Sequence, residues 1–152
     1  MAFNAIEVQK LVDDYKTLTV KVTGIANSQW TANSVVVQAN TLNFANSSVL
    51  CPLVLTKLQY STDAAPTSGY VRIHWVSNTA NANQTMFNFG TSDDGIFEAW
   101  MPNNAPNPSG DVGVALQLPA NSIFNFIMTF IKDNGTGAWA NGYIDTLTGT
   151  YY

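Results

Sequence analysis

The chain has 152 residues, the size of one domain that can bury its own hydrophobic core. Only 11% of its residues are charged, against about 25% in a typical soluble domain, while 46% are apolar, a balance that excludes an intrinsically disordered chain. The net charge is −4 and the six Lys and Arg residues are scattered, which argues against a nucleic-acid-binding protein.

Cys51 is the only cysteine, so no disulfide can form within the chain. Its apolar neighbours Val49, Leu50 and Leu53 indicate a buried, unreactive thiol. The first residues lack the basic and apolar regions of a signal peptide, and no segment reaches the roughly 20 apolar residues of a membrane span. We therefore expect the chain to fold in a cytoplasm and to have no membrane as a partner.

The N-terminal residues carry a helix signal. Asn4 is a good helix N-cap, and Glu7 follows at the position that completes a capping box. The spacing predicts an amphipathic helix over residues 5–16, with an apolar stripe made of Val8, Leu11, Val12 and Tyr15. Such a stripe must be covered, either by the rest of the chain or by a neighbouring subunit. This N-terminal helical segment, residues 1–16, precedes one expected β-sandwich domain, residues 17–152.

From residue 17 onward the apolar period changes to two, which is typical of half-buried strands. Strand patterns separated by turn residues occupy residues 17–24, 34–38, 41–44, 53–60, 70–77, 85–89, 96–101, 112–118, 123–131 and 143–151. They predict an all-β fold, an antiparallel β-sandwich or jelly roll of about 8–10 short strands.

Two further segments bear on the surface of this domain. Residues 123–131 are apolar on both faces, so the second face must be covered either within the chain or by a partner. Residues 101–110 contain Pro102, Pro106 and Pro108, which cannot all belong to a paired central strand and predict a stiff, exposed loop.

The sequence offers few groups for catalysis. His74 is the only histidine and no nucleophile motif accompanies it, so we expect a solvated or interface histidine. Asp93-Asp94-Gly95 resembles a fragment of a calcium loop without its alternating acidic ligands, and we interpret it as a tight turn. Glu98 has no marked second carboxylate to pair with for sugar hydrolysis. We therefore expect no enzyme activity, no catalytic residue, no cofactor and no metal.

The four tryptophans are the remaining candidates for binding. Trp75 shares a strand face with Val71 and Ile73 and is expected in the core. Trp30 and Trp139 lie in turn-rich surroundings and are expected to be partly exposed, either in an interface or in ordinary packing.

Three features of the chain resemble auxiliary virion proteins of tailed bacteriophages, especially small β-sandwich capsid decoration (cement) proteins. They are the short helix after a start without a targeting signal, the Asn- and Thr-rich strands, and the pattern Gly110-Asp-Val-Gly-Val-Ala-Leu116, then 123–132, then Asp133-Asn-Gly135. The resemblance extends over most of the chain and has no diagnostic motif. It implies a non-enzymatic component of the outer capsid surface that folds in the host cytoplasm and bridges subunits of the major capsid protein or other virion proteins, often as a trimer or another homo-oligomer.

We expect the partner contacts to come from the helix stripe, the proline loop and one tryptophan, that is Val8, Leu11, Val12, Tyr15, Pro102, Pro106, Pro108 and Trp139. The alternative is a carbohydrate- or receptor-binding module, tail-fibre or lectin-like, that uses Trp30, Trp100 or Trp139 as a stacking platform.

Overall fold

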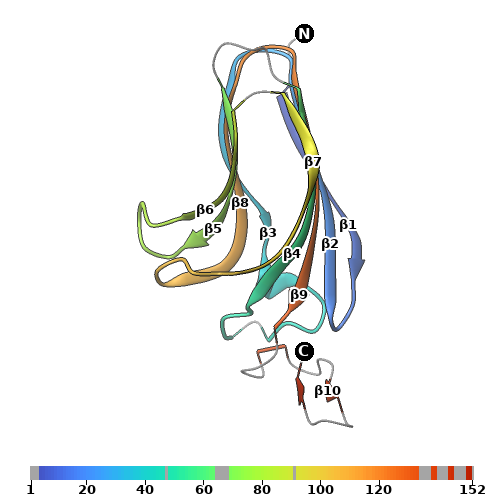
Figure 1. Cartoon of the computed structure of the whole chain (residues 1–152). Coiled ribbons are helices and arrows are strands. Elements are labelled where there is room, and N and C mark those ends of the chain that lie inside the picture. Colours follow the sequence, from blue (N-terminus) through green and yellow to red (C-terminus); the bar gives the residue numbers. More distant parts are fainter. Residues whose placement is uncertain are drawn as a thin grey trace.

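The computed structural model describes residues 4–46, 48–63, 69–90, 92–133, 138–139, 144–145 and 150–151. The strands are β1 (Asn4–Asp13), β2 (Thr17–Ala26), β3 (Trp30–Val37), β4 (Leu53–Asp63), β5 (Tyr70–Ser77), β6 (Gln84–Phe89), β7 (Asp93–Pro102), β8 (Pro108–Leu118), β9 (Ser122–Lys132), β10 (Ile144–Asp145) and β11 (Thr150–Tyr151). A five-stranded sheet of order β1-β2-β9-β4-β7 faces a four-stranded sheet of order β3-β8-β5-β6 (Figure 1). The predicted antiparallel β-sandwich is confirmed.

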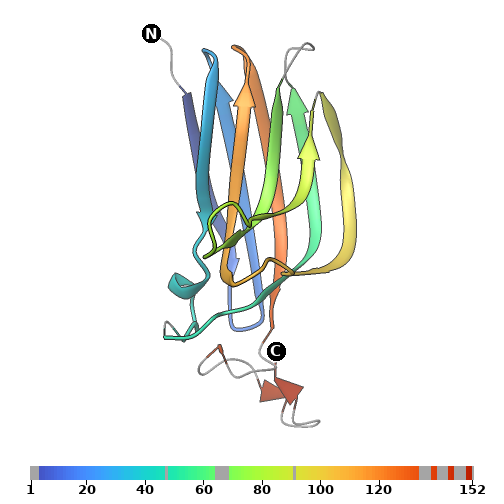
Figure 2. The ribbon, with the colours of Figure 1, turned by 90° about the vertical axis from the view of Figure 1, so that its left-hand side faces the viewer.

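The long strands run side by side along the sandwich, and the separate pair β10–β11 lies beyond one end of it (Figure 2). The connection from β3 to β4 passes through the three-residue 3-10 turn η1 (Ala39–Thr41). Among the described residues, no helix is long and apolar enough to cross a membrane.

The core lies between the two sheets and is filled by alternate residues of each strand. On β9, Phe124, Phe126, Met128 and Phe130 point inward and are fully buried, as their spacing predicts. The ring of Phe130 meets Trp75 of the facing sheet edge-on, with ring centroids 6.0 Å apart. Trp75 is therefore a core residue, as predicted.

The helix predicted for residues 5–16 is wrong, because residues 4–13 form the edge strand β1. β1 pairs with β2 over its whole length, from Asn4 opposite Ala26 to Asp13 opposite Leu18. The side chain of Asn4 caps a turn of the chain instead of a helix: its Oδ1 accepts hydrogen bonds from the backbone N–H groups of Asn27 (3.0 Å) and Ser28 (3.2 Å). The segment 1–16 is thus not a helical unit, since its described part belongs to the five-stranded sheet.

Three further expectations need correction, and a fourth lies mostly outside the described residues. The strand expected at 41–44 is replaced by η1 and a turn in which Phe44 has a φ of 68°. β7 already begins at Asp93, so Asp93-Asp94-Gly95 is strand rather than a tight turn. In the described part of the chain, no helix covers the second face of β9, where Ile123 is 46% exposed. Most of the strand expected at 143–151 falls outside the described residues.

Candidate interaction surfaces

β1 forms an exposed apolar edge of the molecule. It has a neighbouring strand, β2, on one side only, so its other edge carries backbone N–H and C=O groups that no described strand pairs. Val8, Leu11 and Val12 on this strand are between 42% and 46% exposed. A long edge strand with apolar side chains is a ready docking surface for another protein.

The same edge continues into a groove and an aromatic pair. Tyr15, in the turn after β1, meets the ring of Phe44 edge-on with centroids 6.0 Å apart, and both side chains are exposed. We call Val8, Leu11, Val12, Tyr15 and Phe44 the β1 surface. Between β1, β2 and β3 lies a mostly apolar groove of about 320 Å³, lined by Val8, Lys10, Val20, Val35, Val36, Val37, Gln38, Thr41 and Leu42. Four of the eight expected contact residues therefore share one exposed edge.

The proline loop lies at the opposite edge, because Pro102 ends β7 and β7 is the last strand on the other side of the five-stranded sheet. Pro102 and Pro106 are exposed and Pro108 is half-buried. The carbonyl of Pro106 accepts a hydrogen bond from the Ser77 hydroxyl, which ties the loop to the end of β5. The irregular segment is thus shorter than the loop expected over 101–110, because Pro102 still belongs to β7 and Pro108 already belongs to β8, and it does not lie together with the β1 surface.

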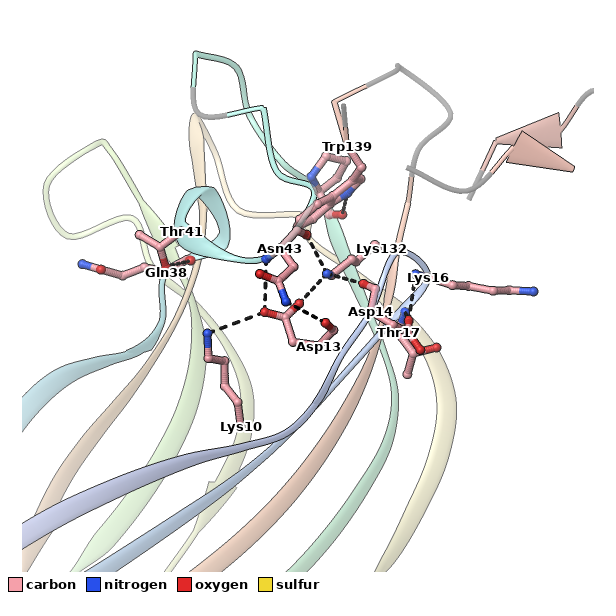
Figure 3. Close-up of polar contacts among 11 residues, drawn as sticks. Lys10, Asp13, Asp14, Lys16, Thr17, Gln38, Thr41, Asn43, Lys132 and Trp139 are labelled. Carbon is pink, nitrogen blue, oxygen red and sulfur yellow. Dashed lines mark hydrogen bonds and ion pairs between the residues drawn. The ribbon is translucent and has the colours of Figure 1, made fainter. Parts of the chain in front are cut away.

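Trp139 is 1% exposed, so its expected exposure is wrong. Its indole Nε1–H donates to the carbonyl of Pro52 at 3.0 Å, and its ring lies 5.1 Å from the ammonium of Lys132 (Figure 3). Lys132 is itself fully buried, and its ammonium donates to Asp13 Oδ1 at 2.5 Å, to the carbonyl of Asn43 at 2.8 Å and to the carbonyl of Asp14. This Lys132 cluster holds the turn after β1 against the end of β9.

Sequence reasoning missed Lys132, although a signal for it was present. Position 132 has the same parity as Phe124, Phe126, Met128 and Phe130, so a continuing strand points it inward. A lysine there needs charged and polar partners close by, which the cluster supplies.

His74 is 4% exposed, so the expected solvated histidine is also wrong. It lies on the outer face of the four-stranded sheet against Gly113, where an added Cβ would come within 2.4 Å of His74 Nε2. Burial lowers the pKa of His74 below its ordinary value, which favours the neutral imidazole. Burial likewise raises the pKa of the Cys51 thiol, which is 1% exposed and matches the predicted buried cysteine.

The other tryptophans and the acidic residues differ in accessibility. Trp30 is half-buried against the core, whereas Trp100 on β7 is exposed. Glu98 lies 3.9 Å from Lys57 in a solvent-exposed ion pair. Within the described ranges, no group of three His, Cys, Asp or Glu side chains could hold a metal ion.

Comparison with known proteins yields distant similarities only. No protein-family model and no curated protein matches the chain. Among solved structures, it is similar to the carbohydrate-binding module BiXyn10A CBM1 in its apo form, with 9% identity and a TM-score of 0.38 over 85% of this chain and 90% of that one. It is also similar to a CBM4 structure, with 14% identity and a TM-score of 0.30 over 86% of this chain and 78% of that one. It is also similar to a structure of infectious bursal disease virus, Gx strain (12%, 0.36), covering 91% of this chain but only 34% of the viral chain. These similarities include both capsid and carbohydrate-binding β-sandwiches, and they are too distant to choose between them.

Proposed function

We propose that the protein is a non-enzymatic structural component of a virus particle, a decoration protein that binds the coat lattice through its β1 surface. The observation that carries this proposal is the edge strand β1, on which Val8, Leu11 and Val12 are exposed and Val8 lines a groove. In monomeric proteins, edge strands are normally short, charged or covered, because an open strand edge can pair with another chain. β1 has ten residues, and although Glu7 and Lys10 add charges to this edge, three large aliphatic side chains on it are between 42% and 46% exposed.

The surface chemistry supports a partner that is a protein. A surface with few charges can be covered at low desolvation cost, because burying a hydroxyl or an amide costs less than burying a charge. The chain has only 16 charged residues of 152, ten acidic and six basic. Its net charge of −4 suits the outer capsid surface, away from packaged nucleic acid.

In this proposal the protein folds in the host cytoplasm and then binds assembled coat, alone or as a homo-oligomer. Binding to the assembled lattice and not to free subunits stabilises the lattice by mass action. No bond is made or broken, so the function needs neither a cofactor nor a metal.

Co-sedimentation with coat shells tests the proposal. Shells of the major capsid protein encoded in the same genome are mixed with the purified chain and separated on a sucrose gradient. We expect the wild-type chain to move with the shells, and the double variant Leu11→Asp/Val12→Asp to bind about tenfold more weakly or worse, because it places charges in the apolar contact.

The matched control is Ile96→Asp, at an exposed position on β7, the opposite edge of the same sheet. It should bind as the wild type does, and circular dichroism should show that all three proteins are folded. Wild-type protein that stays at the top of the gradient, or a double variant that binds unchanged, contradicts the proposal.

A further inference from the structure

A second pocket lies on the side of the sandwich away from β1, where β5 and β6 meet β7. It has a volume of about 300 Å³ and is lined by Trp75, Gln84, Thr85, Met86, Trp100, Met101, Pro102 and Asn104. None of these eight residues is charged, so the pocket suits a neutral ligand.

Trp75 brings an unusual feature to this pocket. The residue is fully buried, and its indole Nε1–H has no hydrogen-bond acceptor among the described residues. An indole nitrogen can only donate a hydrogen bond. A buried donor without an acceptor destabilises the folded state, and native proteins rarely contain one. An oxygen atom of a bound molecule would supply the missing acceptor.

Trp100 and Gln84 supply the other elements of a binding site. Trp100 is 64% exposed and presents an aromatic surface at the pocket, beside the apolar Met101. The Oε1 of Gln84 accepts a hydrogen bond from the backbone N–H of Asn104 at 3.0 Å, which fixes the amide and leaves its NH₂ group as a donor. The lining thus includes one exposed aromatic side chain, Trp100, and two residues that carry a side-chain N–H donor, Trp75 and Gln84.

We propose that this pocket binds a neutral sugar, one pyranose unit of a saccharide. Its C–H face would stack on Trp100, one hydroxyl oxygen would accept from Trp75 Nε1–H, and another would accept from the Gln84 amide. A purely apolar ligand would leave the Trp75 donor unpaired, and an anion would find no cation in the lining. The site lies on the opposite edge from the β1 surface, so this inference goes beyond the proposed function and does not depend on it.

Nuclear magnetic resonance of the ¹⁵N-labelled chain tests the site, because each indole N–H gives its own signal. The probes are the methyl glycosides of glucose, galactose, mannose and N-acetylglucosamine, titrated to about 50 mM, since a single sugar unit binds in the millimolar range. We expect at least one glycoside to shift the Trp75 and Trp100 signals saturably and to leave the Trp30 signal in place.

Two variants on one strand provide the matched comparison. Trp100→Ala should weaken binding about tenfold or more, as truncation of an aromatic anchor does. Ile96→Ala, on the same strand and 61% exposed but outside this pocket, should bind as the wild type does. Gln84→Leu, which keeps Trp75 and the core intact, should also weaken binding.

Two results would overturn the inference. One is that none of the four glycosides moves either signal at the highest concentration. The other is that Trp100→Ala binds as tightly as the wild type does. Because the titration uses the isolated chain, its outcome is independent of whether the protein binds a coat lattice.

Discussion

Lys132 holds together three segments that are far apart in the sequence. Its ammonium has three oxygen acceptors and no exposure to solvent, which matches the three donors of a lysine. Removing the cation would leave Asp13 Oδ1 and two carbonyl oxygens without their donor, while Asp13 Oδ2 would keep the Asn43 N–H (3.1 Å) and the ion pair with Lys10 (3.5 Å). The Asp13 side chain is 8% exposed, so losing its buried cation partner is more costly than losing a surface contact.

We therefore predict that Lys132→Met lowers the free energy of unfolding by about 3 kcal/mol or more. Urea denaturation followed by tryptophan fluorescence measures the change. The matched control is Lys57→Met, which removes the exposed ion pair with Glu98 and should change stability by less than about 1 kcal/mol. Equal effects of the two substitutions would show that the Lys132 cluster is no more than a surface contact.

The buried histidine makes stability depend on pH. Because burial lowers the pKa of His74 in the folded chain, the unfolded chain, in which the imidazole titrates near 6.5, takes up the proton first. The free energy of unfolding therefore falls as the pH drops below 6.5 and stops falling, for this group, below the folded-state pKa.

We predict that His74→Gln removes this part of the pH dependence. Urea midpoints at about pH 7.5 and about pH 5.5 should differ less in the variant than in the wild type. Asp111 has the opposite effect on the free energy of unfolding at lower pH. Burial raises its pKa above 3.8 in the folded chain, in spite of a hydrogen bond from the N–H of Ala39, so the folded chain takes up this proton first. An identical pH dependence in both proteins would mean that His74 reaches water more freely than the structure indicates.

Single residues were predictable from the sequence where the local pattern determines burial. Cys51 and Trp75 lie in the core as their apolar neighbours predict. Trp139 and His74 were misjudged because their cover comes from residues far away in the sequence, such as Pro52 for Trp139. A turn-rich or polar neighbourhood therefore gives no information about burial by tertiary contacts.

At the scale of elements, the pairing of β2 with β9 depends on the absence of one side chain. Gly24 stands opposite Phe124, and a Cβ built on Gly24 would lie 1.9 Å from the Phe124 ring. The ring is fully buried, so it cannot move into solvent to make room. The aromatic ring covers the glycine, which is a known way to support a glycine within a sheet.

We predict that Gly24→Ala lowers the free energy of unfolding by about 1–3 kcal/mol through overpacking. Gly90→Ala is the control, because nothing lies within 4 Å of its added Cβ, and its effect should be within about 0.5 kcal/mol. In a double-mutant cycle, Phe124→Leu should recover part of the loss caused by Gly24→Ala. Simple additivity of the two substitutions would contradict the steric explanation.

The strands from 17 to 131 were largely predictable, whereas the N-terminal strand was not. β2 and β9 alternate between buried and more exposed residues along their whole length, so their period identifies them. In β1 the pairing register with β2 shifts between Lys10 and Val12, which makes Leu11 an extra, bulged residue. Because of this extra residue, the apolar residues of β1 stand at the spacing of a helix. Pairing with the ten residues of β2 outweighs the helix signals at Asn4 and Glu7.

At the scale of the whole molecule, the sandwich has two different edges. One edge carries the β1 surface, and the opposite edge carries β7 with Trp100 and the pocket beside it. A copy attached to a coat lattice through β1 would present the β7 edge away from that contact. With both proposals, one small domain would attach to a particle and offer a second binding site.

A cryo-EM reconstruction of coat shells mixed with the purified chain would show directly whether the protein binds the coat through β1. We expect density for a two-sheet sandwich on the outer surface of the shell, with β1 and the turn at Tyr15 nearest to the coat. Shells without added density, or a bound sandwich whose β1 edge faces solvent, would contradict it.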